Sequence, residues 1–259
     1  MPPRRLPWLL LIILCSAHLA FGPPILTDSD IPRQALTRYQ LSAAQPVPVP
    51  QISAPAAILV DVNSGEILYA LNEHERRAPA SLTKMMTAIV ALQHGQLDQK
   101  IRVSNADLMV YSVAGLKSTE NLTLRNLLYI MLIPSDNAAA MTVARGVGGD
   151  LQTFMQWMNE TAANWGLQDT HFANPHGLDN KNSYMSAYDA AIIAYRFMSN
   201  PVLADIVKYT QANVADHWLE NTNELLMTYS GTIGVKTGTT DDAGECLIAM
   251  VDRPTGKVM

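Results

Sequence analysis

Strand-like patterns stand at two distant places in this chain, and a long helical stretch separates them. Residues 56–70 predict a β-hairpin, because apolar runs flank the turn Asn63-Ser64-Gly65. From about residue 95 to 200 the apolar spacing is largely helical, and strand patterns return at 231–238 and 246–251. We expect the early and late strands to share one antiparallel sheet, which makes the chain an α+β protein with a large helical insertion.

The N-terminal 22 residues have the pattern of a secretory signal peptide. Arg4 and Arg5 precede an apolar run from Leu6 to Ala17, which has the length of a signal h-region and is short for a membrane span. Small residues in Ala20-Phe21-Gly22 indicate a cleavage site. The alternative is an uncleaved N-terminal anchor, and under either interpretation the body of the chain is exported.

Proline content and charge limit what the remaining parts can be. Residues 23–52 hold six prolines, so we expect an extended linker ahead of a domain at 53–259. The net charge is −5 and no long Lys/Arg cluster occurs, which argues against nucleic-acid binding. Cys15 falls in the signal segment, so a mature chain that keeps only Cys246 has no internal disulfide.

One candidate for chemistry is Ser81-Leu82-Thr83-Lys84. Pro79 and the spacing of the following apolar residues predict that Ser81 lies near the N-terminus of an amphipathic helix. Lys84 then lies one turn on, on the same face, so the pair is a candidate nucleophile and base. The plainer interpretation is an N-cap serine and a surface lysine, since chance produces Ser-x-x-Lys about once in a chain this long.

Two further motifs argue against chance. Ser135-Asp136-Asn137 stands at a predicted helix junction and Lys236-Thr237-Gly238 on a predicted strand, and each of the three patterns occurs once. Together they resemble penicillin-binding proteins and class A β-lactamases. The sequence around them resembles the D-alanyl-D-alanine carboxypeptidase branch of the low-molecular-mass penicillin-binding proteins, peptidase family S11. The resemblance is continuous from about 52 to 259, and its clearest stretches are 77–87, 134–139, 174–179, 221–226 and 234–244.

The resemblance implies a β-lactamase/transpeptidase-like serine fold and a division of roles. Ser81 is the expected nucleophile and Lys84 its base, which requires burial and a nearby cation to lower the pKa of the lysine. Lys236 can supply that positive charge and can also attract a substrate carboxylate. Ser135 is expected to relay a proton between Lys84 and the leaving amine.

The remaining expected site residues bind the substrate. Asn137 can bind Lys84 and a backbone amide of the substrate, and Thr237 can hydrogen-bond the terminal carboxylate. The backbone N–H groups of Ser81 and Thr239 are expected, by the resemblance, to form the oxyanion hole. No cofactor or metal is expected, since His171 and His176 fit loop histidines better than metal ligands.

These expectations predict an exported serine-type D-Ala-D-Ala carboxypeptidase at the periplasmic or extracytoplasmic face of the cell envelope. Such a hydrolase acts in peptidoglycan biosynthesis and cell shape. Its substrate would be the peptidoglycan pentapeptide, from which it removes the terminal D-alanine through an acyl-enzyme. β-Lactam antibiotics would acylate Ser81, and a full-length form could associate with the membrane.

Two enzymes of the same fold remain as alternatives. A class A β-lactamase needs a deacylating glutamate between the second and third motifs, where Glu160, Glu220 and Glu224 are the glutamates that occur. A D,D-endopeptidase, which cuts peptide cross-links, carries the same motifs as a carboxypeptidase.

The sequence departs from the family pattern at two places. Asp136 stands where many members have Gly, a position that is not expected to do chemistry. Family members also continue past the last turn with a central strand and a C-terminal helix. We therefore expect a truncated chain that lacks this last strand and helix, a sheet whose two halves are not bridged, and an inactive fragment that folds poorly.

Overall fold

The computed structural model describes residues 37–38, 49–253 and 256–259. The predicted signal peptide at 1–22 lies outside these ranges, as does most of the predicted linker at 23–52. The elements are β1 (Thr37–Arg38), β2 (Ala57–Asp61), β3 (Glu66–Leu71), η1 (Ala80–Leu82, a 3₁₀ turn), α1 (Thr83–His94), β4 (Lys100–Arg102), η2 (Asp107–Met109), β5 (Asn121–Thr123), α2 (Leu124–Leu132), α3 (Asn137–Gly148), α4 (Leu151–Asn164), α5 (Ala187–Ser199), α6 (Pro201–Val207), β6 (Gln211–Val214), β7 (His217–Glu220), α7 (Leu225–Thr228), β8 (Thr232–Thr240), β9 (Gly244–Arg253) and β10 (Gly256–Val258).

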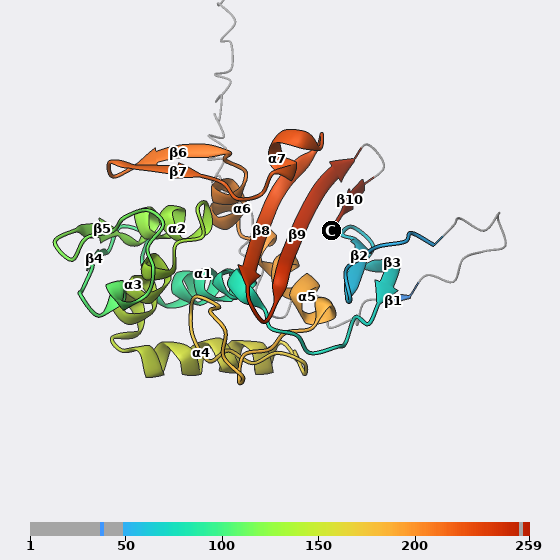
Figure 1. Cartoon of the computed structure of the whole chain (residues 1–259), viewed down its shortest axis with the longest axis horizontal. Helices are drawn as coiled ribbons and strands as arrows, with labels where there is room; N and C mark the ends of the chain where they lie inside the picture. Colours follow the sequence, from blue (N-terminus) through green and yellow to red (C-terminus); the bar gives the residue numbers. More distant parts are fainter. Residues whose placement is uncertain (1–36, 39–48, 254–255) are drawn as a thin grey trace, which may run out of the picture. The chain divides into compact units, whose positions relative to one another are not determined.

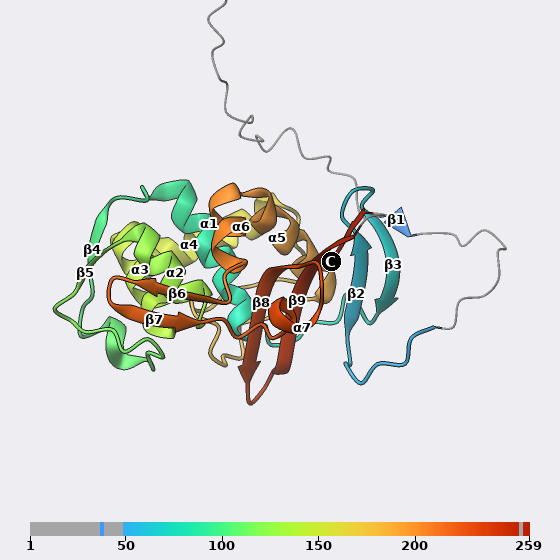
Figure 2. The same cartoon turned by 90° about the horizontal axis from the view of Figure 1, so that it is seen from above.

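The early hairpin and the late strands lie in one sheet, with the order β1-β3-β2-β10-β9-β8 (Figure 1). The short strand β1 runs parallel to β3, and every other neighbouring pair is antiparallel. Figure 2 shows β2 and β3 on one side of β8 and β9 and most of the helices on the other. The predicted α+β sheet with a helical insertion is therefore confirmed, and β8 lies where the sheet meets the helices.

The expectation that the two halves of the sheet are not bridged is wrong. Strand β10 pairs antiparallel with both β9 and β2. Val60 N donates to Met259 O at 2.7 Å, and Met259 N donates to Val60 O at 2.9 Å. Residues 256–259 are enough to reach the edge of β2. A short strand therefore occupies the place where the last strand was expected to be missing.

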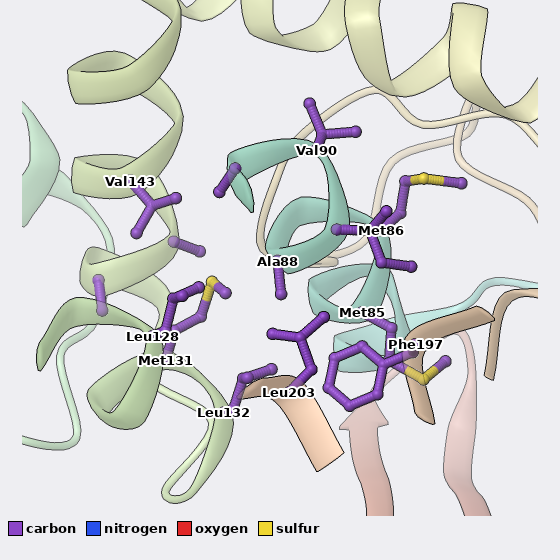
Figure 3. Close-up of a cluster of buried hydrophobic side chains, with 14 of the residues drawn as sticks. Met85, Met86, Ala88, Val90, Leu128, Met131, Leu132, Val143, Phe197 and Leu203 are labelled. Atoms are coloured by element: carbon purple, nitrogen blue, oxygen red, sulfur yellow. The ribbon is translucent and has the colours of Figure 1, made fainter. Parts of the chain in front are cut away.

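Helix α1 is the centre of the core. Every residue from Thr83 to Ala91 is buried, so the polar side chains Thr83, Lys84 and Thr87 of this helix lie inside the protein and not at its surface. Such a helix is stable only when other elements surround it. Figure 3 shows Met85, Met86, Ala88 and Val90 of α1 packed among side chains of α2, α3, α5 and α6.

Helix ends follow local capping signals. Helix α2 begins at Leu124, because Thr123 caps it: its Oγ1 accepts a hydrogen bond from Asn126 N at 3.1 Å. The residues before it pair instead with β4. Pro201 opens the unpredicted helix α6 at its first turn, where the missing N–H of proline has no cost, and Asn200 caps it.

In the part of the chain that the structure describes, no single helix has the length and apolar character to cross a membrane.

An ion pair between the buried Asp107 and the partly exposed Arg145 attaches the η2 segment to α3, the helix that carries Asn137. Asp107 is 1% exposed, and its two oxygens accept hydrogen bonds from Arg145 Nε at 2.9 Å and Arg145 Nη2 at 2.7 Å. Thr142 Oγ1 and Ser104 N also donate to this carboxylate. Four donors therefore hold one carboxylate.

We predict that Asp107→Ala lowers the free energy of unfolding by about 3 kcal/mol, because it leaves Arg145 without its buried partner. Urea denaturation measures this loss. The matched control is Glu75→Ala, which breaks the exposed pair between Glu75 and Arg77 and should cost less than about 1 kcal/mol. Equal losses in the two variants would contradict the prediction.

Candidate active site

Ser81 lies in the 3₁₀ turn η1, immediately before α1 begins at Thr83. Ala80, the residue before it, has a positive φ of 47°, so the chain turns sharply at this point. Lys84 follows one turn later, and its Nζ lies 2.8 Å from Ser81 Oγ. The expected nucleophile and base are therefore within hydrogen-bond distance of each other.

Lys84 joins three segments of the chain. Its side chain is 0% exposed, so the plainer interpretation of a surface lysine is wrong. In addition to Ser81 Oγ, Nζ lies 2.7 Å from Asn137 Oδ1 on α3 and 2.7 Å from the backbone oxygen of His176. Every polar neighbour of the amine can accept a hydrogen bond from it.

The junction between α2 and α3 presents the second motif. Ser135 has a positive φ of 65°, and Asp136 then caps α3 by accepting a hydrogen bond from Ala139 N at 2.7 Å. Asn137 is the first residue of α3 and points its amide oxygen at Lys84. Ser135 Oγ is buried and has no hydrogen-bond partner among the described residues.

Strand β8 supplies the third motif. Lys236 is 1% exposed, and its Nζ donates to Thr237 O at 2.8 Å. The Thr237 hydroxyl contacts the hydroxyl of Thr222, which precedes α7. Thr239 lies further along β8 and is exposed. This edge of the site therefore carries one buried cation and two neighbouring hydroxyl groups.

Two glycines permit the close approach of other segments to the Ser81 turn. A Cβ at Gly238 would lie 2.7 Å from Ser81 N, so β8 reaches the turn only because this residue has no side chain. A Cβ at Gly177 would lie 1.9 Å from Ala80 O, in the loop that also carries the His176 carbonyl.

Burial changes the pKa values of three groups at this site. Burial and then the Lys236 ammonium hold the pKa of Lys84 well below its usual value, while the Asp136 carboxylate opposes this shift. Burial lowers the pKa of Lys236 to about 7. Burial and the charge of Lys84 lower the pKa of His176 to about 4, so this imidazole is neutral at pH 7. A neutral amine at Lys84 is thus accessible near neutral pH.

The structure brings most of the predicted site residues together. Ser81, Lys84 and Asn137 form one hydrogen-bonded group. Lys236 acts on Lys84 through its charge, and Ser135 lies two residues from Asn137. Thr237 and Thr239 follow on β8, where Gly238 touches the Ser81 turn.

Two contributors were not predicted from the sequence. The backbone oxygen of His176 binds Lys84, and the Thr222 hydroxyl lies beside that of Thr237. Both belong to stretches that resemble the family, 174–179 and 221–226, which is the signal that could have pointed to them. A carbonyl contact leaves no trace in residue type, because every residue carries a carbonyl.

Within the described ranges, no group of three or more His, Cys, Asp or Glu side chains is placed to hold a metal ion.

The known sequences that resemble this chain belong to one enzyme family. A model of the D-alanyl-D-alanine carboxypeptidase family, peptidase S11, matches residues 40–258. D-alanyl-D-alanine carboxypeptidase DacF of Bacillus subtilis is 37% identical over 207 residues, and DacA of Haemophilus influenzae is 33% identical over 237 residues. These alignments cover 76% and 83% of this chain but only 53% and 58% of the relatives, so the chain spans little more than half of their length.

Solved structures with the same architecture support the predicted fold. The Streptomyces K15 DD-transpeptidase is 33% identical with a TM-score of 0.77, over 82% of this chain and 90% of that one. D-alanyl-D-alanine carboxypeptidase DacD from Francisella tularensis is 27% identical with a TM-score of 0.75, over 85% of this chain and 70% of that one. The predicted transpeptidase-like serine fold is confirmed.

We predict that Gly177→Ala destabilises the chain more than Gly166→Ala does. Both glycines have a positive φ, 90° and 72°, so both substitutions carry a backbone cost of about 1 kcal/mol. Only the Cβ at Gly177 meets another atom, Ala80 O at 1.9 Å, while Gly166 faces open space. Thermal unfolding of the two variants measures the difference, and equal melting temperatures would show that the loop is not tightly packed on the Ser81 turn.

Proposed function

This chain belongs to the D-alanyl-D-alanine carboxypeptidase family, peptidase S11, and we propose that it is a serine D,D-carboxypeptidase of the bacterial cell wall. It removes the terminal D-alanine from the pentapeptide stems of peptidoglycan, in the periplasm or at the extracytoplasmic face. The catalytic domain spans residues 53–259. The observation that carries the proposal is a fully buried Lys84 whose Nζ lies 2.8 Å from Ser81 Oγ.

The surroundings of Lys84 support its role as the base. Asn137 Oδ1 and His176 O are acceptors only, and each lies 2.7 Å from Nζ. When the Lys84 amine is neutral, its two N–H groups donate to these two acceptors. The lone pair is then left for the O–H of Ser81 to donate to, which is the arrangement that proton removal from a serine requires.

Acylation follows from this geometry. Ser81 Oγ attacks the carbonyl carbon of the penultimate D-alanine while its proton passes to Lys84 Nζ. The carbonyl oxygen becomes an oxyanion, which the N–H groups of Ser81 and Thr239 stabilise, each such donor contributing about 3–4 kcal/mol. The C–N bond then breaks, and the leaving amine takes a proton that Ser135 relays from Lys84. In deacylation, water attacks the ester carbonyl while its proton passes to Lys84. Ser81 Oγ then leaves and takes a proton back from Lys84.

The substrate carboxylate is held on β8. Thr237 donates its hydroxyl hydrogen bond to the terminal carboxylate, beside the Thr222 hydroxyl that it contacts. Lys236 adds positive charge to this end of the site, although burial lowers its pKa to about 7. The same residues receive the carboxylate of a β-lactam, so these antibiotics acylate Ser81 and deacylate slowly.

The three glutamates that are candidates for the deacylating residue of a β-lactamase are exposed, whereas Lys84 is buried. Glu160 is exposed on α4 and accepts a hydrogen bond from Gln156 Nε2 at 2.7 Å. Glu220 accepts one from Trp218 Nε1 at 3.1 Å, and Glu224 is exposed at the start of α7. These positions favour slow deacylation over rapid β-lactam turnover.

We predict that Ser81→Ala abolishes acylation by fluorescent penicillin and lowers D-alanine release at least about 10⁴-fold, because it removes the nucleophile. Gel labelling and an assay for free D-alanine measure the two effects. The control is Ser199→Ala, which changes an exposed serine on α5 and should behave as wild type. Labelling that persists in Ser81→Ala would refute the assignment.

We predict that Lys236→Met moves the acid limb of the acylation rate to higher pH. The Lys236 charge lowers the pKa of Lys84, so its loss raises that pKa and a higher pH is needed to obtain the neutral base. Stopped-flow acylation with a fluorescent penicillin over a pH series measures the limb. Lys208→Met, which changes an exposed lysine, should leave the limb in place. A limb that moves to lower pH in Lys236→Met would contradict the prediction.

A further inference from the structure

Asp136 makes more contacts than a helix cap needs. It is 0% exposed and lies between Ser135 and Asn137. Its Oδ1 accepts the capping hydrogen bond from Ala139 N at 2.7 Å. Its Oδ2 accepts two further hydrogen bonds, from Ser112 Oγ at 2.7 Å and from Ala114 N at 2.9 Å. One oxygen therefore holds the helix, and the other holds a different segment of the chain.

That segment, residues 110–116, meets the core through Leu116, which is 6% exposed, and Val110 and Ala114 pack beside it. Tyr111 is 75% exposed and Val113 is 53% exposed, so these side chains add little burial. Ser112 Oγ also accepts a hydrogen bond from Leu116 N at 3.0 Å, which folds the segment back on itself. Ala114 O lies 2.8 Å from His217 Nδ1 of β7, so the same segment also supports the β6–β7 hairpin.

We propose that Asp136 is a positioning residue for the reaction: its carboxylate binds segment 110–116 to the start of α3 and so fixes Ser135 and Asn137 beside Lys84. This inference rests on the proposed carboxypeptidase function. Asn137 is the first helical residue after Asp136, and its Oδ1 holds Lys84 Nζ at 2.7 Å. A shift of the junction between α2 and α3 would therefore move Asn137, which contacts Lys84 directly.

A cap alone does not account for these contacts. Asp150 caps α4 with the same geometry, accepting from Thr153 N at 2.7 Å, and its second oxygen accepts from Thr153 Oγ1 of the same helix. At Asp136 the second oxygen reaches 22 and 24 residues back along the chain. Since asparagine caps a helix as well as aspartate, an Asn at each position separates the capping role from the rest.

The charge of Asp136 gives a second, independent signature. The charged and titratable groups that face Lys84 are Lys236 from β8, Asp136 from the cap of α3, and the neutral His176 from its loop. Asp136 raises the pKa of Lys84, in opposition to burial and Lys236. Loss of its charge should therefore lower that pKa and move the acid limb of acylation to lower pH, which a purely structural role would not do.

The test compares Asp136→Asn, Ser112→Ala and the control Asp150→Asn in the full chain, by penicillin acylation rate against pH and by thermal unfolding. We expect Asp136→Asn to lower the plateau rate about 10- to 100-fold and to shift the acid limb to lower pH. Ser112→Ala removes one bond to segment 110–116 without a change of charge, so it should lower the rate and leave the limb in place. Asp150→Asn should match wild type.

The following outcomes would overturn the inference. An Asp136→Asn variant with wild-type rate and limb would show that Asp136 only caps α3, and a limb that moves to higher pH would contradict its electrostatic role. If Asp136→Asn does not fold, a wild-type rate in Ser112→Ala decides against the proposal. Failure of the wild-type chain to be acylated at all would instead remove the proposed function on which the inference rests.

Discussion

The site depends on one buried amine. Lys84 Nζ contacts Ser81 on the turn before α1, Asn137 on α3 and the carbonyl of His176, so three segments that are distant in sequence meet at one atom. Because Lys84 is 0% exposed, its amine depends on these partners for its hydrogen bonds. The contacts that satisfy Lys84 are therefore the same contacts that align Ser81, the proposed nucleophile.

This arrangement carries a cost in stability. Two lysines, Lys84 and Lys236, are buried with pKa values below those of free lysine, so the unfolded chain binds more protons than the folded chain at neutral pH. Folding is thus opposed at neutral pH, and the opposition declines as the pH rises toward the pKa of free lysine. The carboxylate of Asp136 reduces this cost at Lys84, while Lys236 increases it. The lowered pKa that suits Lys84 to its proposed role as a base is therefore also the quantity that destabilises the fold.

The sequence was sufficient where local signals decide the outcome. Caps, apolar spacing and the turn at 63–65 predict the hairpin, the helix after Ser81 and the helical stretch from about 95 to 200, and the three motifs predict Ser81, Lys84 and Asn137 as one group. It was insufficient where distant segments approach each other. The carbonyl of His176, the hydroxyl of Thr222 and the second oxygen of Asp136 act through tertiary contacts that no short pattern encodes. The burial of α1 on every side was missed for the same reason.

The sheet also shows which contacts hold β8 at the site. Strand β10 joins β2 to β9 only at one end of these two strands. A cavity of about 450 Å³, which Met259 helps to line, lies between β2, β9 and α5. The sheet alone therefore does little to fix β8 relative to Ser81. The direct contact of Gly238 with the Ser81 turn does this instead, because its missing side chain lets the two backbones touch. Lys236 and Thr237 precede this glycine on the same strand, so the contact of Gly238 with the Ser81 turn, rather than strand pairing, sets their distance from Ser81.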